Sequence, residues 1–287
     1  AVEGELPEHW TAARRTHANI AAMVVAARLE DERRAPTAEE RRTLAAYSGW
    51  GGLTIEGAAH RFPQDFPVPE PRGLIHEFYT PAAVCAEVAR VVEPLLPAGV
   101  VNALEPSAGI GRFIRAFEGQ PRVRWQAVEY SELSARMLSA LRPDLDLFSG
   151  SFERWVREKE ATWSGRLQLV VSNPPYGARG ASITEDPNRE YRERLAYHYF
   201  MRRALDLLAP DGLGVFLVPA GFLTGKTEAL RGLREKVLLR HHLAAAFRLP
   251  SMKPDGRGAI FPGAMLATDL LFFRSRGGTL AEVHTSD

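Results

Sequence analysis

The sequence predicts an α/β protein: a seven-stranded, mostly parallel sheet with helices on both faces, preceded by a small helical N-terminal appendage. From Glu77 onward, short apolar runs alternate with amphipathic stretches, which is the pattern of repeated strand-helix units. Before that point apolar residues recur at helical spacing between arginines, and residues 62–72 are dense in proline. A boundary near residue 70 therefore divides the chain into a helical region with its linker, 1–70, and a sheet domain, 71–287.

The N-terminal region contains two predicted helices. Trp10–Glu30 carries Ala, Ile, Met, Val and Leu at helical spacing, and Ala38–Tyr47 follows the break at Pro36-Thr37. Ser48–Leu53 is rich in glycine and predicts a turn, in which Trp50 is expected to pack rather than to take part in chemistry.

Seven short apolar runs are the predicted strands, enough for a complete domain. They are Val100–Leu104, Val123–Val128, Leu145–Phe148, Leu167–Val171, Gly214–Val218, Leu243–Arg248 and Leu266–Phe273. Cys85 lies between the linker and the first of these strands and is expected on the buried face of a helix.

Composition excludes several classes of protein. The 287 residues are 45% hydrophobic, and 36 Lys and Arg against 35 Asp and Glu leave a net charge of +1, so any contact with a polyanion must be a local patch. One cysteine excludes a disulfide framework and a Cys-rich zinc site. His198, His241 and His242 lack metal-ligand spacing with acidic residues.

Two further expectations concern location and completeness. With no signal peptide and no run of 18 apolar residues, the sequence favours the cytoplasm and no membrane contact. The chain opens without methionine and stops just after a strand-like run, so we expect it to be a piece of a longer protein.

The loop after the first predicted strand has the composition of a cofactor site. In an open parallel sheet this loop lies at the topological switch point, where small residues let the backbone approach a ligand. A dinucleotide fingerprint would need a small residue where Ile114 stands, so the loop suits a cofactor without a pyrophosphate. Its residues are Glu105, Pro106, Ser107, Ala108, Gly109, Ile110 and Gly111.

An acidic residue ends the second predicted strand. Glu129 comes 18 residues after Gly111 and is placed to accept hydrogen bonds from two ribose hydroxyls. Tyr130, which follows it, can pack on an adenine face.

The fourth predicted strand runs directly into Asn173-Pro174-Pro175-Tyr176. Two consecutive prolines cannot continue a β-ladder, so the chain must leave the sheet here as a stiff loop. Asn173 offers a side-chain carbonyl, Pro174 a main-chain carbonyl, and Tyr176 a flat aromatic face. Two hydrogen-bond acceptors and an aromatic ring that can stack suit an amino group on a planar system, such as a nucleobase or a carboxamide.

In this order, the motifs resemble those of the S-adenosylmethionine-dependent N6-adenine DNA methyltransferases, whose cofactor motifs precede Asn-Pro-Pro-Tyr. The resemblance covers residues 78–274 and implies the Rossmann-like methyltransferase fold, S-adenosylmethionine as cofactor and DNA as substrate. Phe78-Tyr79-Thr80-Pro81 is similar to the family's leading motif, whose threonine closes over the methionine end of the cofactor. Thr80 also suits the N-cap of the following helix.

Two more segments carry the resemblance. Gly212–Pro219 matches the element behind the target pocket. Ile260-Phe261-Pro262 resembles a hairpin where the family places an aromatic residue against an extruded base, although Phe261 is equally well explained as a core residue. The resemblance thus implies a catalytic motif at residues 173–176, with Asn173 also at the cofactor and the target base stacked by Tyr176 and Phe261.

The chain departs from the family after the third strand. Many relatives carry an acidic residue before a phenylalanine there, where this chain has Ser151 and Phe152. Phe152 is expected to stack on the cofactor adenine, and Ser151 to hydrogen-bond its amino group without supplying a charge. Glu153 could substitute for the acid only if the loop is bent.

Several alternatives remain open. The same two acceptors would serve RNA-adenine, N4-cytosine or protein-glutamine methylation, or the chain could be a non-catalytic cofactor-binding module. The N-terminal segment is similar to the part preceding the methylase in large phage- and plasmid-type methyltransferase-helicase proteins, which implies helicase and target-recognition domains outside this chain. A group of arginines after the catalytic motif fits either a phosphate-contacting rim or a solvated helix face: Arg179, Arg189, Arg192 and Arg194.

Overall fold

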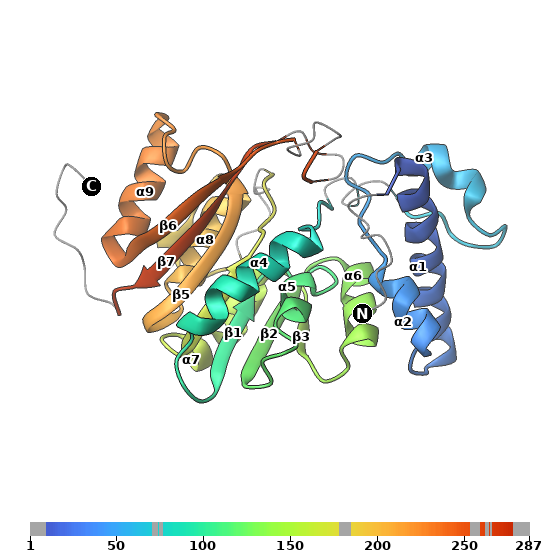
Figure 1. The fold of residues 1–287 in the computed structure, drawn as a ribbon, viewed down its shortest axis with the longest axis horizontal. Helices are drawn as coiled ribbons and strands as arrows, with labels where there is room; N and C mark the ends of the chain where they lie inside the picture. Colours follow the sequence, from blue (N-terminus) through green and yellow to red (C-terminus); the bar gives the residue numbers. More distant parts are fainter. Residues whose placement is uncertain are drawn as a thin grey trace.

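The computed structural model describes residues 10–70, 74, 77–177, 185–252, 259–261, 264 and 266–277. Its core is a seven-stranded sheet with the order β3-β2-β1-β4-β5-β7-β6, and helices cover both faces (Figure 1). The predicted fold class is confirmed. The strands are β1 Val101–Glu105, β2 Val123–Glu129, β3 Asp146–Ser149, β4 Leu167–Ser172, β5 Leu208–Pro219, β6 His241–Leu249 and β7 Thr268–Ser275.

Helices precede the sheet and connect its strands. The α-helices are α1 Ala12–Glu32, α2 Ala38–Ala45, α3 Ile55–Ala58, α4 Ala82–Val92, α5 Arg112–Ala116, α6 Glu132–Leu141, α7 Phe152–Trp163, α8 Ala196–Leu205 and α9 Glu228–Arg240. Short 3-10 turns are η2 Ala59–Arg61, η4 Glu93–Leu95 and η5 Arg189–Tyr191. None of the helices in the described ranges is long and apolar enough to cross a membrane.

The strand order creates a switch point between β1 and β4. β1 pairs in parallel with both β2 and β4, and the chain reaches β4 only after crossing to β3. Loops leaving β1 and β4 therefore diverge at the same edge of the sheet, where α/β proteins bind their ligands. Both predicted motifs begin at this edge, one after Glu105 and the other after Ser172.

Side chains of the central strands alternate between two apolar layers. In β4, Leu169 and Val171 pack on the face covered by α4 and α5, whereas Val170 packs on the face covered by α7, α8 and α9. β5 repeats the alternation. Cys85 is buried on α4, as predicted. The period of two fixes which side chains face each layer of helices.

All seven strands differ from their predicted bounds by at least one residue, and β5 differs most. β5 begins at Leu208, six residues before the predicted start, since its first half contains Pro210, Asp211 and Gly212, which sequence patterns assign to turns. Asp211 has a positive φ of 60°, and the register of β5 with β4 shifts between Leu167 and Leu169, so an irregularity absorbs the turn residues. β7 lies two residues later than predicted.

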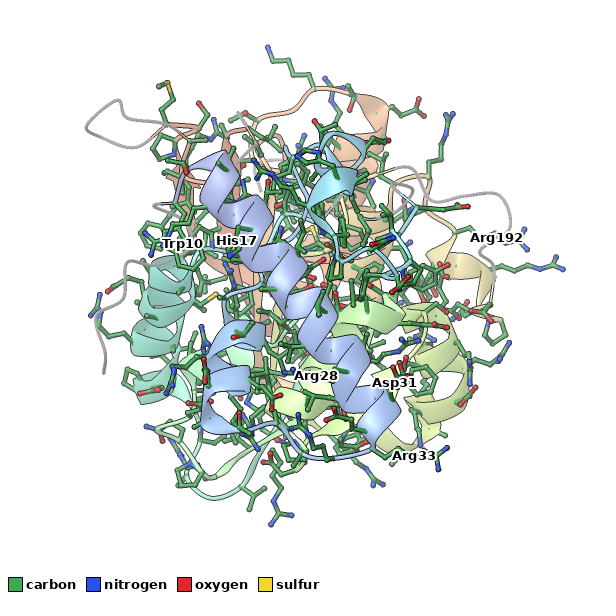
Figure 2. The ribbon with its side chains drawn as sticks, turned by 90° about the vertical axis from the view of Figure 1, so that its right-hand side faces the viewer. Trp10, His17, Arg28, Asp31, Arg33 and Arg192 are labelled. Carbon is green, nitrogen blue, oxygen red and sulfur yellow. The ribbon has the colours of Figure 1, made fainter. Side chains whose placement is uncertain are left out.

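The N-terminal helices share a core with the sheet domain. α1 crosses one side of the molecule (Figure 2), and its buried face joins residues of α2, α3 and α6 in a third apolar cluster. Arg41 on α2 donates hydrogen bonds to Ala140 O and Leu141 O at the carboxyl end of α6. Met137 and Ile110 belong to the same cluster. The helical region is thus packed directly against the sheet domain.

Two buried polar residues of α1 hold the glycine-rich turn. Arg15 donates from Nη2 to Gly49 O at 3.3 Å and to Gly51 O at 3.2 Å. Asn19 donates to Gly49 O and accepts from Ser48 N, both at 2.8 Å. Trp50 is fully buried and stacks on Phe62, so its packing role is confirmed. The turn is therefore a rigid part of the fold.

Arg15→Ala should destabilise the protein by about 3 kcal/mol, since the buried carbonyls of Gly49 and Gly51 would lose their charged donor. Urea unfolding measures the change. Arg42→Ala, which removes an exposed arginine from α2, is the matched control and should change stability by less than about 0.5 kcal/mol. Equal losses in the two variants would contradict the anchoring role of Arg15.

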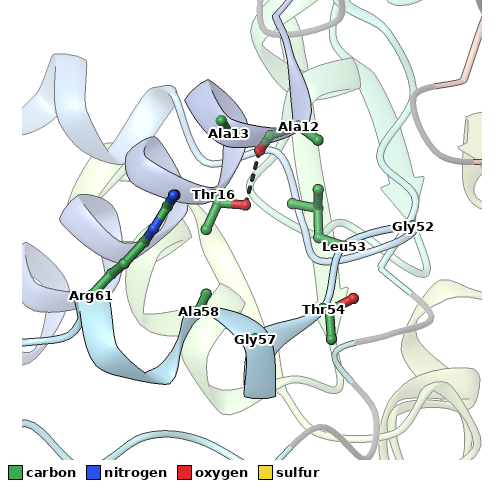
Figure 3. A pocket seen from close by; sticks show the side chains of 9 residues that line it. All are labelled: Ala12, Ala13, Thr16, Gly52, Leu53, Thr54, Gly57, Ala58 and Arg61. Carbon is green, nitrogen blue, oxygen red and sulfur yellow. Dashed lines mark hydrogen bonds between the residues drawn. The ribbon is translucent and has the colours of Figure 1, made fainter.

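A shallow pocket of about 330 Å³ lies between α1, the turn and α3 (Figure 3). The Thr16 hydroxyl, which lines it, is hydrogen-bonded to Ala12 O at 2.9 Å, and Arg61 is its charged lining residue. None of its lining residues belongs to the loops at the carboxyl ends of β1 and β4. This pocket is therefore separate from the switch point between β1 and β4.

Candidate active site

The loop after β1 forms a tight cradle. Gly109 and Gly111 adopt positive φ angles of 55° and 74°. A Cβ at Gly109 would lie 2.4 Å from the Tyr79 ring, and one at Gly111 would lie 2.7 Å from a Leu138 methyl group. Glycine is needed at both positions for conformation and for space, as the predicted cofactor loop requires.

Glu129 joins this loop to the end of β2. Its Oε2 accepts a hydrogen bond from Gly109 N at 2.6 Å, and its Oε1 accepts one from Ser131 N at 2.7 Å. Burial raises the pKa of Glu129, against the lowering effect of these backbone donors. The next residue, Tyr130, is 75% exposed. The predicted ribose acid is thus held by the backbone, with a free aromatic ring beside it.

Glu105, the last residue of β1, is a second buried carboxyl group beside the glycine loop. It is 3% exposed, and its Oε2 has no hydrogen-bond partner among the described residues. Burial and the neighbouring charge of Glu129 raise its pKa well above the ordinary range. An orphaned acidic oxygen beside a glycine cradle fits a ligand that brings a hydrogen-bond partner.

Asn173 forms a hydrogen-bonded corner at the carboxyl end of β4. Its Nδ2 donates to Phe78 O and Thr80 Oγ1, both at 3.2 Å. Its Oδ1 accepts from the Tyr176 hydroxyl at 2.8 Å, which also lies 3.2 Å from Leu217 O. The leading motif and the Asn-Pro-Pro-Tyr motif, nearly 100 residues apart, therefore meet at one amide group.

A hydroxyl group joins the corner to the cofactor loop. Ser107 Oγ donates to Asn173 O at 3.1 Å and lies 3.0 Å from Ser172 Oγ. Pro174 is buried, whereas Pro175 is exposed. Burial raises the pKa of Tyr176, so the phenol stays protonated and can donate to Asn173. The corner is rigid, half-buried and continuous with the glycine cradle.

The N-cap prediction for Thr80 was wrong. The N-cap of α4 is Pro81, and no side chain caps that helix. The Thr80 hydroxyl instead accepts from Asn173 Nδ2. A residue before proline is restricted to extended backbone, which here directs the threonine toward β4 rather than along its own helix.

Two of the predicted stacking residues lie in the core. Phe152 is 2% exposed and packs between Trp155 and Phe200, and Phe261 is 5% exposed in the layer that contains α4. Tyr176 is half-buried, and its ring lies 6.2 Å from the Tyr197 ring in an edge-on arrangement. Of the predicted base-stacking pair, the structure places only Tyr176 at the corner.

Ser151 caps the N-terminus of α7, the helix that follows it. Its Oγ accepts from Arg154 N at 3.1 Å as the N-cap of α7, and it donates to the carboxylate of Glu185. Glu153, the other acid considered for this place, is buried and 4% exposed. The carboxylate nearest to Ser151 among the described contacts therefore comes from a different loop.

Sequence reasoning missed two residues that support the site. Arg112 donates to Thr80 O at 2.9 Å and to Tyr47 O at 3.2 Å, and its guanidinium lies 5.7 Å from the centre of the Tyr79 ring. Glu77 accepts from the Tyr47 hydroxyl at 2.6 Å. Both connect the helical region to the leading motif, and neither has a local sequence signal, because their partners are distant in the chain.

Glu77→Gln should change how stability depends on pH. Burial raises the pKa of Glu77 from 4.5 to about 7. As the pH rises, Glu77 loses its proton in the unfolded chain before it does so in the folded protein. The contribution of Glu77 to folding stability is therefore fully present below pH 4.5 and is lost as the pH rises through 7. Wild type should therefore lose about 3 kcal/mol relative to the variant between pH 4 and pH 8. Urea unfolding of both proteins tests this, and a constant difference would contradict it.

The described residues contain no group of three or more His, Cys, Asp or Glu side chains that could hold a metal ion. Arg189, Arg192 and Arg194 are exposed, and Arg192 points outward from the molecule (Figure 2). Arg179, the fourth member of the predicted rim, lies outside the described residues.

Two sequence comparisons relate the chain to known proteins. Residues 126–252 match the family model described as Eco57I restriction-modification methylase. The chain is also similar to Defense against restriction protein B of Escherichia phage P1, with 29% identity over 248 residues. That match takes in 86% of this chain, which spans only 10% of the phage protein's length.

Solved structures share the fold at low sequence identity. A modification subunit of a putative type I restriction enzyme from Vibrio vulnificus is 20% identical, with a TM-score of 0.60 over 86% of this chain and 51% of its own. A putative class I S-adenosylmethionine-dependent methyltransferase from Listeria monocytogenes is 16% identical, with a TM-score of 0.59 over 86% and 70%. A type I restriction-modification methyltransferase subunit from Streptococcus thermophilus, also 16% identical, has a TM-score of 0.56 over 84% and 51%.

These likenesses establish the fold. The family match begins in β2, includes the Asn-Pro-Pro-Tyr motif and ends three residues after β6. Residues 126–252 therefore match the Eco57I restriction-modification methylase model, and the chain has the class I methyltransferase fold.

Proposed function

We propose that this chain transfers a methyl group from S-adenosylmethionine to the N6 amine of adenine in DNA. The observation that carries the proposal is the Asn173 corner. The half-buried side-chain amide of Asn173 donates a hydrogen bond from Nδ2 to Thr80, which fixes its orientation. Its Oδ1 accepts a hydrogen bond from the Tyr176 hydroxyl, and we propose that the target amine replaces this donor. An exocyclic amine could take the place of that hydroxyl without rebuilding the corner.

The crevice at the carboxyl ends of β1 and β2 suits the proposed cofactor. Glu129 would bind the ribose hydroxyls, and Tyr130 would cover one face of the adenine. The unpartnered Glu105 oxygen and the tight turn at Gly109 support a polar ligand held close to the backbone. When bound, S-adenosylmethionine supplies an electrophilic methyl group on its sulfonium.

We propose that the remaining residues of the predicted cofactor set also contact the cofactor. Those whose side chains or backbone would contact it are Tyr79, Thr80, Pro106, Ser107, Ala108 and Gly111. In the described structure Phe152 is a buried neighbour rather than a stacking surface. We therefore assign adenine stacking to Tyr130.

The residues of the corner would activate the target amine. Its lone pair is delocalised into the ring, so nitrogen must become more tetrahedral before it attacks. Asn173 Oδ1 and the Pro174 carbonyl would accept its two hydrogens and stabilise the positive charge that develops, an effect of about 3 kcal/mol per well-placed group. A base in a duplex is out of reach, so the target must be flipped out or single-stranded.

Target selection would depend on parts outside this chain. The phage relative is about ten times longer than the matched region, and its printed name concerns restriction. We propose that covalently linked or associated target-recognition and helicase domains position DNA for this methylase. The exposed arginines after the motif would contact phosphates near the target.

Radiolabelled S-adenosylmethionine tests the proposal with full-length protein. Label should enter adenine-containing DNA and appear as N6-methyladenine after digestion. Label confined to RNA, to cytosine or to glutamine of a protein would favour one of the alternative substrates. Cofactor binding without transfer to any of these would favour a non-catalytic module, and failure to bind the cofactor would contradict the proposal as a whole.

A further inference from the structure

A carboxylate from the chain after the catalytic motif reaches the end of β3. Ser151, at the start of α7, donates a hydrogen bond to Glu185, although the two residues are 34 positions apart. Gly150 N donates to Glu129 O at 2.8 Å, so this loop adjoins the proposed ribose acid. Glu185 thus lies beside the part of the crevice where the adenine of the proposed cofactor would end.

The position of Glu185 is fixed by the residue that follows it. Asp186 accepts from Arg203 Nε at 2.7 Å and from the Tyr199 hydroxyl at 3.0 Å, and the side chains of Asp186 and Arg203 are both 2% exposed. Arg203 also makes two hydrogen bonds to Glu160 on α7, at 2.8 and 2.7 Å. A buried ion-pair network therefore anchors the backbone next to Glu185 to α8 and α7.

Glu185 itself remains partly accessible. Its side chain is 38% exposed, and Arg157 lies 3.8 Å from Oε1, beyond hydrogen-bond distance. The Ser151 hydroxyl donates to the other oxygen, Oε2. The carboxylate therefore keeps accepting capacity for a further donor.

We propose that Glu185 is a specificity-determining residue for the cofactor, accepting a hydrogen bond from the amino group of its adenine. This rests on the proposed use of S-adenosylmethionine. The chain has Ser151 where an acidic residue would stand, and Glu185 supplies the carboxylate from the loop after the catalytic motif. Ser151 acts as a positioning residue, because its hydroxyl orients the carboxylate.

Calorimetric binding to full-length protein tests this with two probes. S-adenosylhomocysteine carries the amino group, whereas S-inosylhomocysteine has a carbonyl oxygen there and would place two acceptors together. Wild type should bind the first at least tenfold more tightly. Glu185→Gln, whose amide can donate to that oxygen, should reduce the preference to within about threefold.

Glu158→Gln is the matched control. Glu158 also pairs with Arg157, at 3.7 Å, and lies on α7, but its described contacts do not include Ser151. It should keep the wild-type preference. An unchanged preference in Glu185→Gln would overturn the assignment of Glu185 while leaving the proposed function intact. Absence of S-adenosylhomocysteine binding in wild type would instead overturn the proposed function.

Discussion

Replacing Asn173 with alanine should lower the rate of methyl transfer at least a hundredfold while leaving cofactor affinity within about threefold of wild type. The substitution removes the side-chain oxygen that would accept a hydrogen from the target amine, and a preorganised group of this kind contributes about 10² to 10³ in rate. A fall in turnover at saturating cofactor and DNA, with little change in binding, is the signature of an interaction made in the transition state.

The same substitution also removes two donated hydrogen bonds, to Phe78 O and Thr80 Oγ1. S-adenosylhomocysteine binding should therefore be measured alongside the rate, to separate loss of chemistry from loosening of the leading motif. Asn102→Ala is a matched control, since Asn102 lies near the opposite end of β1 and donates to Arg166 O. If Asn173→Ala retains full turnover, Asn173 has no part in the mechanism.

Glu129→Ala should weaken cofactor binding about a hundredfold. The carboxylate would accept from two ribose hydroxyls, and hydrogen bonds to a charged group contribute about 1.5 to 3 kcal/mol each. Glu129 also accepts from Gly109 N, so its loss would leave that donor and the glycine cradle less well held. Turnover at saturating cofactor should change much less than affinity.

Calorimetry with S-adenosylhomocysteine measures the affinity of the Glu129 variant. Glu132→Gln, on the first turn of α6 and paired with Arg136 at 3.4 Å, removes a nearby exposed acid and should bind normally. Unchanged affinity in Glu129→Ala would show that the ribose is bound elsewhere.

The sheet could be predicted because its strands are apolar and evenly spaced. Leu169, Val170 and Val171 form a continuous apolar run because helices bury both of their faces. The first half of β5 could not be predicted in this way. Pro210 and Gly212 are turn residues by their local preferences, and only pairing with β4 and β7 keeps that segment in the sheet.

The site was predictable where a motif is local. Gly109 and Gly111 predict a tight loop because glycine readily adopts positive φ, and the two prolines after Asn173 predict a stiff corner. The contacts between motifs carry no such signal. Ser151 is hydrogen-bonded to Glu185, which lies in a separate loop. Arg112 donates hydrogen bonds to both Thr80 and Tyr47, and so connects the leading motif to the N-terminal region.

Burial could not be predicted from residue type alone. Phe152 and Phe261 are aromatic residues at positions where the family stacks its ligands, yet both are enclosed by neighbouring side chains. An apolar ring is equally suited to a core and to a stacking surface, and the packing of α4, α7 and α8 decides between them.

A crystal structure of the full-length protein with S-adenosylhomocysteine tests the central claim most directly. We predict a ligand in the crevice at the carboxyl ends of β1 and β2, with both ribose hydroxyls on Glu129 and its sulfur directed toward the Asn173 corner. A ligand bound elsewhere, or a sulfur atom separated from Asn173 by packed side chains, would contradict this account of the site.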